Sequence, residues 1–116
     1  LGFTVLLSLS ALTLQGCSSG LEPDTFSVEL NEMDYGSRNP PAVITIRSNI
    51  AEPIEVTNVT VNNGQCSYMG HDTRFNFPLH FQMGQIFRLR LKQCNFSNVV
   101  QVDIETTKGN ASYQFN

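Results

Sequence analysis

Residues 87–92, Phe-Arg-Leu-Arg-Leu-Lys, alternate without interruption between apolar and basic side chains. Neighbouring side chains of a β-strand point to opposite faces, so this period of two predicts a strand. Its three apolar side chains would face a core, and its three basic side chains would face water.

The same alternation occurs in shorter segments elsewhere in the chain. Within residues 54–61 the apolar positions step from even numbers, at Ile54 and Val56, to odd numbers, at Val59 and Val61. That step predicts a β-bulge or a bend near Asn58. Turn-forming sequences rich in Gly, Asn and Pro separate the segments. The other predicted strands cover residues 26–30, 42–46, 79–81, 100–105 and 111–115.

These segments favour an all-β fold. No stretch of about 12 residues combines a helical period with capping residues. About seven strands over residues 25–116 resemble the architecture of a single immunoglobulin-like antiparallel β-sandwich, although the Trp typical of antibody domains is absent. If residues 87–92 and 100–105 form a hairpin, basic side chains would meet Asp103 and Glu105 across it.

The charged residues are unevenly distributed along the 116-residue chain. The first 16 residues contain none, whereas all seven Lys and Arg and all ten Asp and Glu follow Cys17. The basic residues are scattered, and the net charge is −3. Nucleic-acid-binding domains usually carry a basic patch or stripe, so no nucleic-acid partner is expected.

Residues 1–16 form an uncharged, largely apolar leader. Its about 14 mostly apolar residues are too few for a transmembrane helix, which needs roughly 20, and they suit a secretory signal peptide. The chain starts at Leu1 without Met or the basic residues that open such signals, so we expect an N-terminally incomplete signal peptide. A buried core helix is the alternative, but the leader has no polar face to turn to water.

The leader ends in Leu14-Gln15-Gly16-Cys17, which resembles the lipobox of bacterial lipoproteins. The resemblance implies a diacylglycerol on the sulfur of Cys17 and cleavage before that residue. Residues 17–24 would then be a lipidated cysteine with a short tether to a membrane. Ser18 is not the Asp that favours inner-membrane retention in this family. The resemblance therefore implies the outer membrane of the bacterial envelope, with the periplasmic face favoured over the exterior.

The remaining cysteines form an even pair. If Cys17 carries lipid, Cys66 and Cys94 are left to form one disulfide across 28 residues of sequence. Two free buried thiols are the alternative. A zinc site that also uses His71 and His80 is disfavoured, because the spacings match no common zinc pattern, and no metal site is expected.

Catalytic residues are not indicated. Neither of the only two histidines, His71 and His80, belongs to a nucleophile motif, and the chain has no glycine-rich phosphate loop. The acidic residues are spread along the alternating segments rather than gathered. We therefore expect a protein that is not an enzyme and needs no cofactor.

Residues 64–78 are the segment in which binding is expected. A connection of this length in a compact domain usually binds something or is disordered. It contains residue types that are enriched at interfaces, and Cys66 would restrain its start. We expect Phe77 to turn inward and Tyr68, His71 and Arg74 to face outward. The predicted partner-binding residues are Tyr68, Met69, His71, Arg74 and Phe75.

Three functions are compatible with these observations. The first is an envelope lipoprotein that binds other envelope proteins, as a structural component of a membrane-spanning secretion or conjugation assembly. The second is a plasmid- or phage-encoded exclusion lipoprotein that occupies a receptor through residues 64–78. The third is a binding module for a small ligand or glycan that uses Tyr68, His71 and Arg74.

Overall fold

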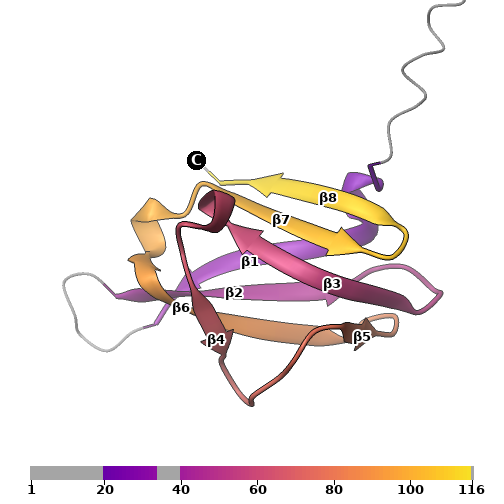
Figure 1. Cartoon of the computed structure of the whole chain (residues 1–116), viewed down its shortest axis with the longest axis horizontal. Helices are drawn as coiled ribbons and strands as arrows, with labels where there is room; N and C mark the ends of the chain where they lie inside the picture. Colours follow the sequence, from indigo (N-terminus) through magenta and orange to yellow (C-terminus); the bar gives the residue numbers. More distant parts are fainter. Residues whose placement is uncertain (1–19, 34–39, 116) are drawn as a thin grey trace, which may run out of the picture.

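The chain folds into two antiparallel four-stranded sheets that pack face to face, as the computed structural model in Figure 1 shows. The structure describes residues 20–33 and 40–115. The predicted signal peptide, residues 1–16, and the predicted lipidation site Cys17 lie outside the described residues. The all-β sandwich expected from the sequence is confirmed.

The strand order is β1-β2-β6-β4 in the first sheet and β5-β3-β7-β8 in the second. All neighbouring strands run antiparallel. Short 3₁₀ turns lie at Pro23–Thr25 (η2), Asn62–Gly64 (η3) and Phe96–Asn98 (η4). The strands are β1 (Phe26–Glu32), β2 (Pro41–Ser48), β3 (Ile54–Val61), β4 (Tyr68–Gly70), β5 (Leu79–Phe81), β6 (Ile86–Asn95), β7 (Gln101–Thr106) and β8 (Gly109–Gln114).

The described residues contain eight strands rather than about seven. All seven predicted strands are present, and the additional one is β4. It lies inside the segment that was expected to be one long connection. β4 has only three residues, and its pairing depends on β6, with Met69 opposite Arg90. Tyr68-Met69-Gly70 lacks the apolar-polar-apolar alternation that the equally short β5, Leu-His-Phe, shows in the sequence.

The predicted irregularity in β3 is confirmed. The pairing of β3 with β7 shifts register between Val56, opposite Thr106, and Asn58, opposite Glu105. One additional residue in β3 lets Val56 and Val59 both face the core despite their odd separation. This is the physical reason for the step from even to odd apolar positions in the sequence.

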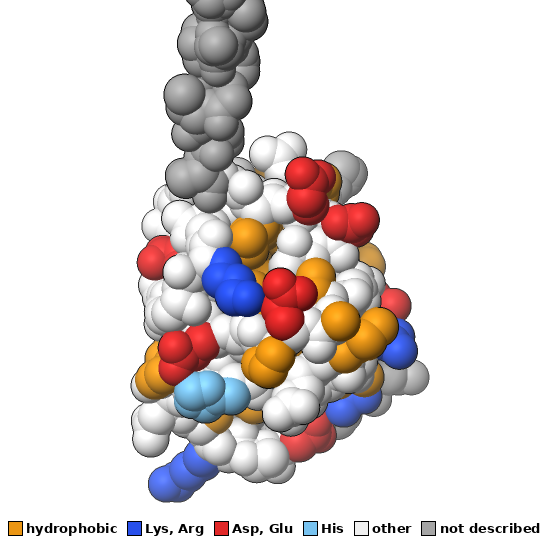
Figure 2. Space-filling view, turned by 90° about the vertical axis from the view of Figure 1, so that its right-hand side faces the viewer, with side chains coloured by type: hydrophobic (Ala, Val, Ile, Leu, Met, Phe, Trp, Pro, Cys, Tyr) orange, Lys and Arg blue, Asp and Glu red, His pale blue; other side chains and the backbone are white. Residues whose placement is uncertain are grey.

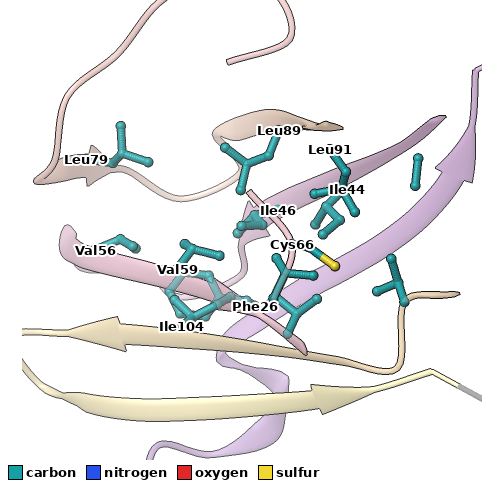
Figure 3. Packing of buried hydrophobic residues seen from close by; sticks show 14 of the residues in the cluster. Phe26, Ile44, Ile46, Val56, Val59, Cys66, Leu79, Leu89, Leu91 and Ile104 are labelled. Carbon is teal, nitrogen blue, oxygen red and sulfur yellow. The ribbon is translucent and has the colours of Figure 1, made fainter. Parts of the chain in front are cut away.

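The core lies between the two sheets. In Figure 3, Ile44, Ile46 and Leu89 of the first sheet lie across the interior from the labelled residues of the second, such as Val56 and Ile104. All five of these side chains are at most 1% exposed. Burial of each such side chain contributes about 1.5–3 kcal/mol, so the interlocked apolar rows are the main source of stability.

The predicted hairpin between residues 87–92 and 100–105 is wrong. β6 pairs with β2 and β4 in the first sheet, whereas β7 pairs with β3 and β8 in the second. The connection through η4 therefore crosses from one sheet to the other. Local alternation predicts that a segment is a strand but not which strand it pairs with.

Asn62 ties two of the crossings between the sheets, β3–β4 and β6–β7, to each other. Its Nδ2 donates to the carbonyl oxygen of Asn98 at 2.8 Å, and its Oδ1 accepts from the backbone N–H groups of Val100 and Gln101 at 2.8 and 3.1 Å. Asn62 adopts a positive φ of 52°, which Asn tolerates better than most residues. The η3 turn thus also holds the β6–β7 crossing in place.

The described part of the predicted tether lies against the domain. The backbone N–H of Leu21 donates to the carbonyl oxygen of Asn110 at 2.8 Å, and Gly20 forms a parallel bridge with Asn110. Leu21 packs on the core, and Thr25 is buried. The ordered domain therefore begins at or before Gly20, at the end of the sandwich that carries the β7–β8 turn.

Candidate protein-interaction site

The Cys66–Cys94 disulfide braces the start of the candidate site. Its Cα atoms are 5.7 Å apart, and the two residues are separated by 28 positions in the sequence. Cys66 is only 3% exposed and belongs to the core cluster, while Cys94 is half-buried near the end of β6. The bond links the β3–β4 crossing to β6, so residues 67–70 are held beside β6 from their first residue.

An aromatic cluster supports β4 from the core side. The ring of Tyr68 stacks on Phe75 with centroids 6.5 Å apart, and Phe75 contacts Phe77 and Phe87 edge to face at 5.3 and 4.7 Å. All four rings are partly buried against the core. Their arrangement fixes residues 75–77 beneath β4, and the predicted inward position of Phe77 is confirmed.

Tyr68 was predicted to face outward, and this is wrong. Its hydroxyl donates a 2.5 Å hydrogen bond to the carbonyl oxygen of Val59, in the opposite sheet. Burial raises the pKa of the Tyr68 phenol above its ordinary value of 10.0. Phe75 is likewise packed inward. A strand of three residues cannot bury its aromatic ring by itself, so Tyr68 turns toward the only apolar surface available, the gap between the sheets.

Of the five predicted partner-binding residues, Met69 and Arg74 are exposed. Met69 is 45% exposed on the outer face of β4, and Arg74 is exposed in the following loop. Together they border a hollow of about 490 Å³ beside β4. The hollow is lined by Tyr68, Met69, Gly70, Arg74, Phe75 and Asn76. The rings of Tyr68 and Phe75 therefore each border the hollow with one side, although both pack toward the core.

Two of the three residues of β4 direct their backbone hydrogen-bonding groups away from β6, on the side that borders the hollow. On the β6 side, the carbonyl oxygen of Ser67 accepts from Lys92 and the N–H of His71 donates to Arg88. Backbone groups of an antiparallel strand alternate in direction, so those of Tyr68 and Gly70 point away from β6. β4 is the last strand of its sheet. An extended peptide is the kind of ligand that such an edge accepts.

His71 and Asp72 do not form a catalytic pair. Asp72 accepts a hydrogen bond from Arg88 at 3.1 Å, so its carboxylate is directed to β6 rather than to the imidazole. His71 is half-buried, and its Nδ1 is buried with no hydrogen-bond partner among the described residues. Of the three residues expected to contact a small ligand, Tyr68 and Arg74 line the hollow beside β4, whereas His71 does not.

Gly70 is a site residue that the sequence reasoning missed. A Cβ atom at this position would lie 1.9 Å from the carbonyl oxygen of Thr73 and 3.0 Å from the Phe75 ring. Only glycine lets residues 71–75 pass this close beneath β4. The signal in the sequence was a glycine at the end of a short apolar stretch, Tyr68-Met69-Gly70.

A hollow of about 780 Å³, larger than the one beside β4, is lined by Leu30 of the edge strand β1 together with Phe96 and Phe115. The end of the sandwich that carries the β7–β8 turn differs from both places. Figure 2 shows that end, where acidic, basic and hydrophobic side chains are interspersed. Among residues 20–33 and 40–115, no group of three or more His, Cys, Asp or Glu side chains is placed to hold a metal ion. No helix within those ranges has the length and apolar character required to cross a membrane.

The fold and this site define a two-sheet antiparallel β-sandwich domain with a disulfide-braced edge strand. No protein-family model, curated protein or solved structure matches the chain.

Proposed function

We propose that this protein is a non-enzymatic lipoprotein of the bacterial envelope whose β-sandwich binds another envelope protein through the β4 edge. The observation that carries the proposal is the outward-facing backbone of Tyr68 and Gly70 beside the hollow near Arg74. An extended segment of the partner would add to β4 as a further strand. Main-chain hydrogen bonds would supply affinity, and Met69 and Arg74 would supply specificity.

The braced geometry favours binding over a mere surface loop. The disulfide, the Tyr68 hydrogen bond and the aromatic cluster fix β4 before any partner arrives. Preorganisation lowers the entropic cost of ordering an interface. A rigid but very short edge strand also limits non-specific pairing, which long exposed edges invite.

The anchor follows from the lipobox resemblance, and the position of Gly20 sets its reach. Only Ser18 and Ser19 lie between Cys17 and the first described residue. Three residue steps span at most about 10 Å. A lipid on Cys17 would therefore hold the β7–β8 end of the domain close to the outer membrane, on its periplasmic face. That placement suits a component of a larger membrane-spanning assembly, such as a secretion or conjugation machine.

Site-specific photocrosslinking tests the proposed binding edge. A photoreactive phenylalanine analogue at Met69 of the full-length protein, irradiated in native envelopes, should give one discrete adduct with a partner. The matched control places the analogue at Ala51, which is exposed in the turn between β2 and β3 and lies outside the β4 edge and both sheet faces. Adducts of equal yield at both positions, or none at Met69, would refute binding at the β4 edge.

A separate experiment tests the anchor. The intact mass of protein extracted from membranes should correspond to a chain that begins at Cys17 and carries acyl groups. Cys17→Ser should leave the precursor unlipidated and remove the mature form from the outer-membrane fraction. An unmodified Cys17 in the native protein would remove the lipoprotein assignment while leaving the edge-binding proposal standing.

A further inference from the structure

The outer face of the first sheet is basic. Arg47 of β2 and Arg88, Arg90 and Lys92 of β6 project from it, because they alternate with the buried Ile46, Leu89 and Leu91. These are four of the six Lys and Arg residues in the described ranges. The acidic residues nearby are fewer: Glu29 on β1, and Asp72, which pairs with Arg88.

The outer face of the second sheet is acidic. Glu55 of β3 and Asp103 and Glu105 of β7 alternate with buried residues and therefore point away from the core. The four strands of this sheet contain no Lys or Arg. The residues paired with Asp103 and Glu105 on both sides, such as Thr60 and Asn58, are uncharged. The folded domain is thus electrically polar across its thickness.

The two faces carry charges of opposite sign at the same spacing along the strands. Side chains two positions apart on one strand are about 6.6–6.8 Å apart, a spacing that Arg88, Arg90 and Lys92 share with Asp103 and Glu105. The faces cannot meet within one molecule, because both sheets and the core lie between them. The basic face also exposes apolar surface at Ile86, 44%, and Met69, 45%.

We infer that the basic face of one copy docks on the acidic face of a second copy of this chain. The contact is head to tail, so each docked copy leaves one face free and copies can add in a row. A four-stranded face is roughly 20 Å wide, and it would bury less than the about 800 Å² per partner of a standard interface. Association is therefore weak, concentration-dependent and sensitive to salt. It does not involve the anchor. Met69 borders both the basic face and the β4 edge hollow, whereas none of the four basic residues of that face lines the hollow.

Zero-length crosslinking tests this contact. The protein is expressed in cells from its full-length sequence and purified with whatever processing and modification it receives there. A carbodiimide joins a carboxylate to an amine only when the two touch. Lys92 and Glu105 lie on opposite outer faces, so a peptide that links Lys92 to Glu105 or Asp103 must come from two molecules. We expect this product in the native protein at low salt, and at least a tenfold lower yield in 0.5 M NaCl.

Charge reversal supplies the decisive comparison. Arg90→Glu and Glu105→Lys should each reduce the crosslink at least tenfold, and an isotope-labelled mixture of the two variants should restore it between labelled and unlabelled copies. Glu22→Lys, an exposed change outside both faces, should leave the yield unchanged. The absence of the Lys92 crosslink in the native protein overturns the inference, and so does a yield unaffected by salt and by both reversals. The salt dependence needs no variant, so it decides the matter if a reversal fails to fold.

Discussion

The Tyr68 hydroxyl donates a hydrogen bond to the carbonyl oxygen of Val59 at 2.5 Å and so ties the edge strand β4 of one sheet to β3 of the other. Within the described part of the chain, no other side chain of β4 forms a hydrogen bond to the opposite sheet. This bond and the Cys66–Cys94 disulfide hold the candidate binding edge from two sides. The following predictions test how much each restraint contributes.

Tyr68→Phe should lower the free energy of unfolding by about 0.5–1.5 kcal/mol. The substitution keeps the ring stacked on Phe75 but leaves the carbonyl oxygen of Val59 without this donor. Denaturant titration at neutral pH measures the change. Tyr113→Phe is the comparator. The Tyr113 hydroxyl donates to the carbonyl oxygen of Pro23 and accepts from the backbone N–H of Phe26, so its removal should lower the free energy of unfolding by at least as much. An unchanged unfolding midpoint for Tyr68→Phe would contradict the structural role of the bond.

Stability should fall as the pH rises above about 10. Burial raises the pKa of Tyr68 and of Tyr113 above 10.0 in the folded protein, and the carboxylate of Asp24 adds to the shift at Tyr113. Between the unfolded and the folded pKa, the native state keeps a proton that the unfolded chain has lost, so unfolding becomes easier with rising pH. Below pH 9 these groups should have no effect.

Thermal unfolding of a Cys17→Ser protein between pH 8 and 11 measures this dependence without interference from a free thiol. Tyr68→Phe removes one of the two titrating groups and should flatten the alkaline decline. A decline of equal steepness in Tyr68→Phe and Tyr113→Phe and in the parent would show that other groups cause it.

The Cys66→Ala/Cys94→Ala double variant should lose roughly 3–4 kcal/mol, the chain-entropy estimate for a closed loop of 28 residues. That is a large share of the about 5–15 kcal/mol typical of a single domain. The double variant avoids a leftover reactive thiol. Reduction of the parent protein should reproduce the loss, and a smaller effect of reduction than of the double substitution would indicate that cavity formation at the buried Cys66 contributes as well.

Gly70→Ala should destabilise the domain by about 1–3 kcal/mol, because its Cβ would overlap the carbonyl oxygen of Thr73 and force residues 71–75 to move. Met69→Ala is the matched control one position away, since Met69 is exposed and its truncation should change stability by less than about 0.5 kcal/mol. Differential scanning calorimetry compares the two. Equal melting temperatures would mean that the segment beneath β4 adjusts freely and is not braced.

By itself, the sequence determined which segments are strands wherever apolar and polar side chains alternate along the chain. Alternation over two-residue steps predicted seven of the eight strands, and the parity change after Val56 predicted the bulge of β3, because both reflect which side of one strand faces the core. The even count of remaining cysteines predicted the Cys66–Cys94 bond.

Only the tertiary structure decided how the strands are assorted between the sheets. It placed β6 and β7 in different layers, and it thereby separated Lys92 from Glu105 and made one face basic and the other acidic. It also turned Tyr68 and Phe75 inward and gave β4 a partner in β6. Strand pairing is decided by contacts between distant segments that compete for one core, and no local period records the outcome of that competition.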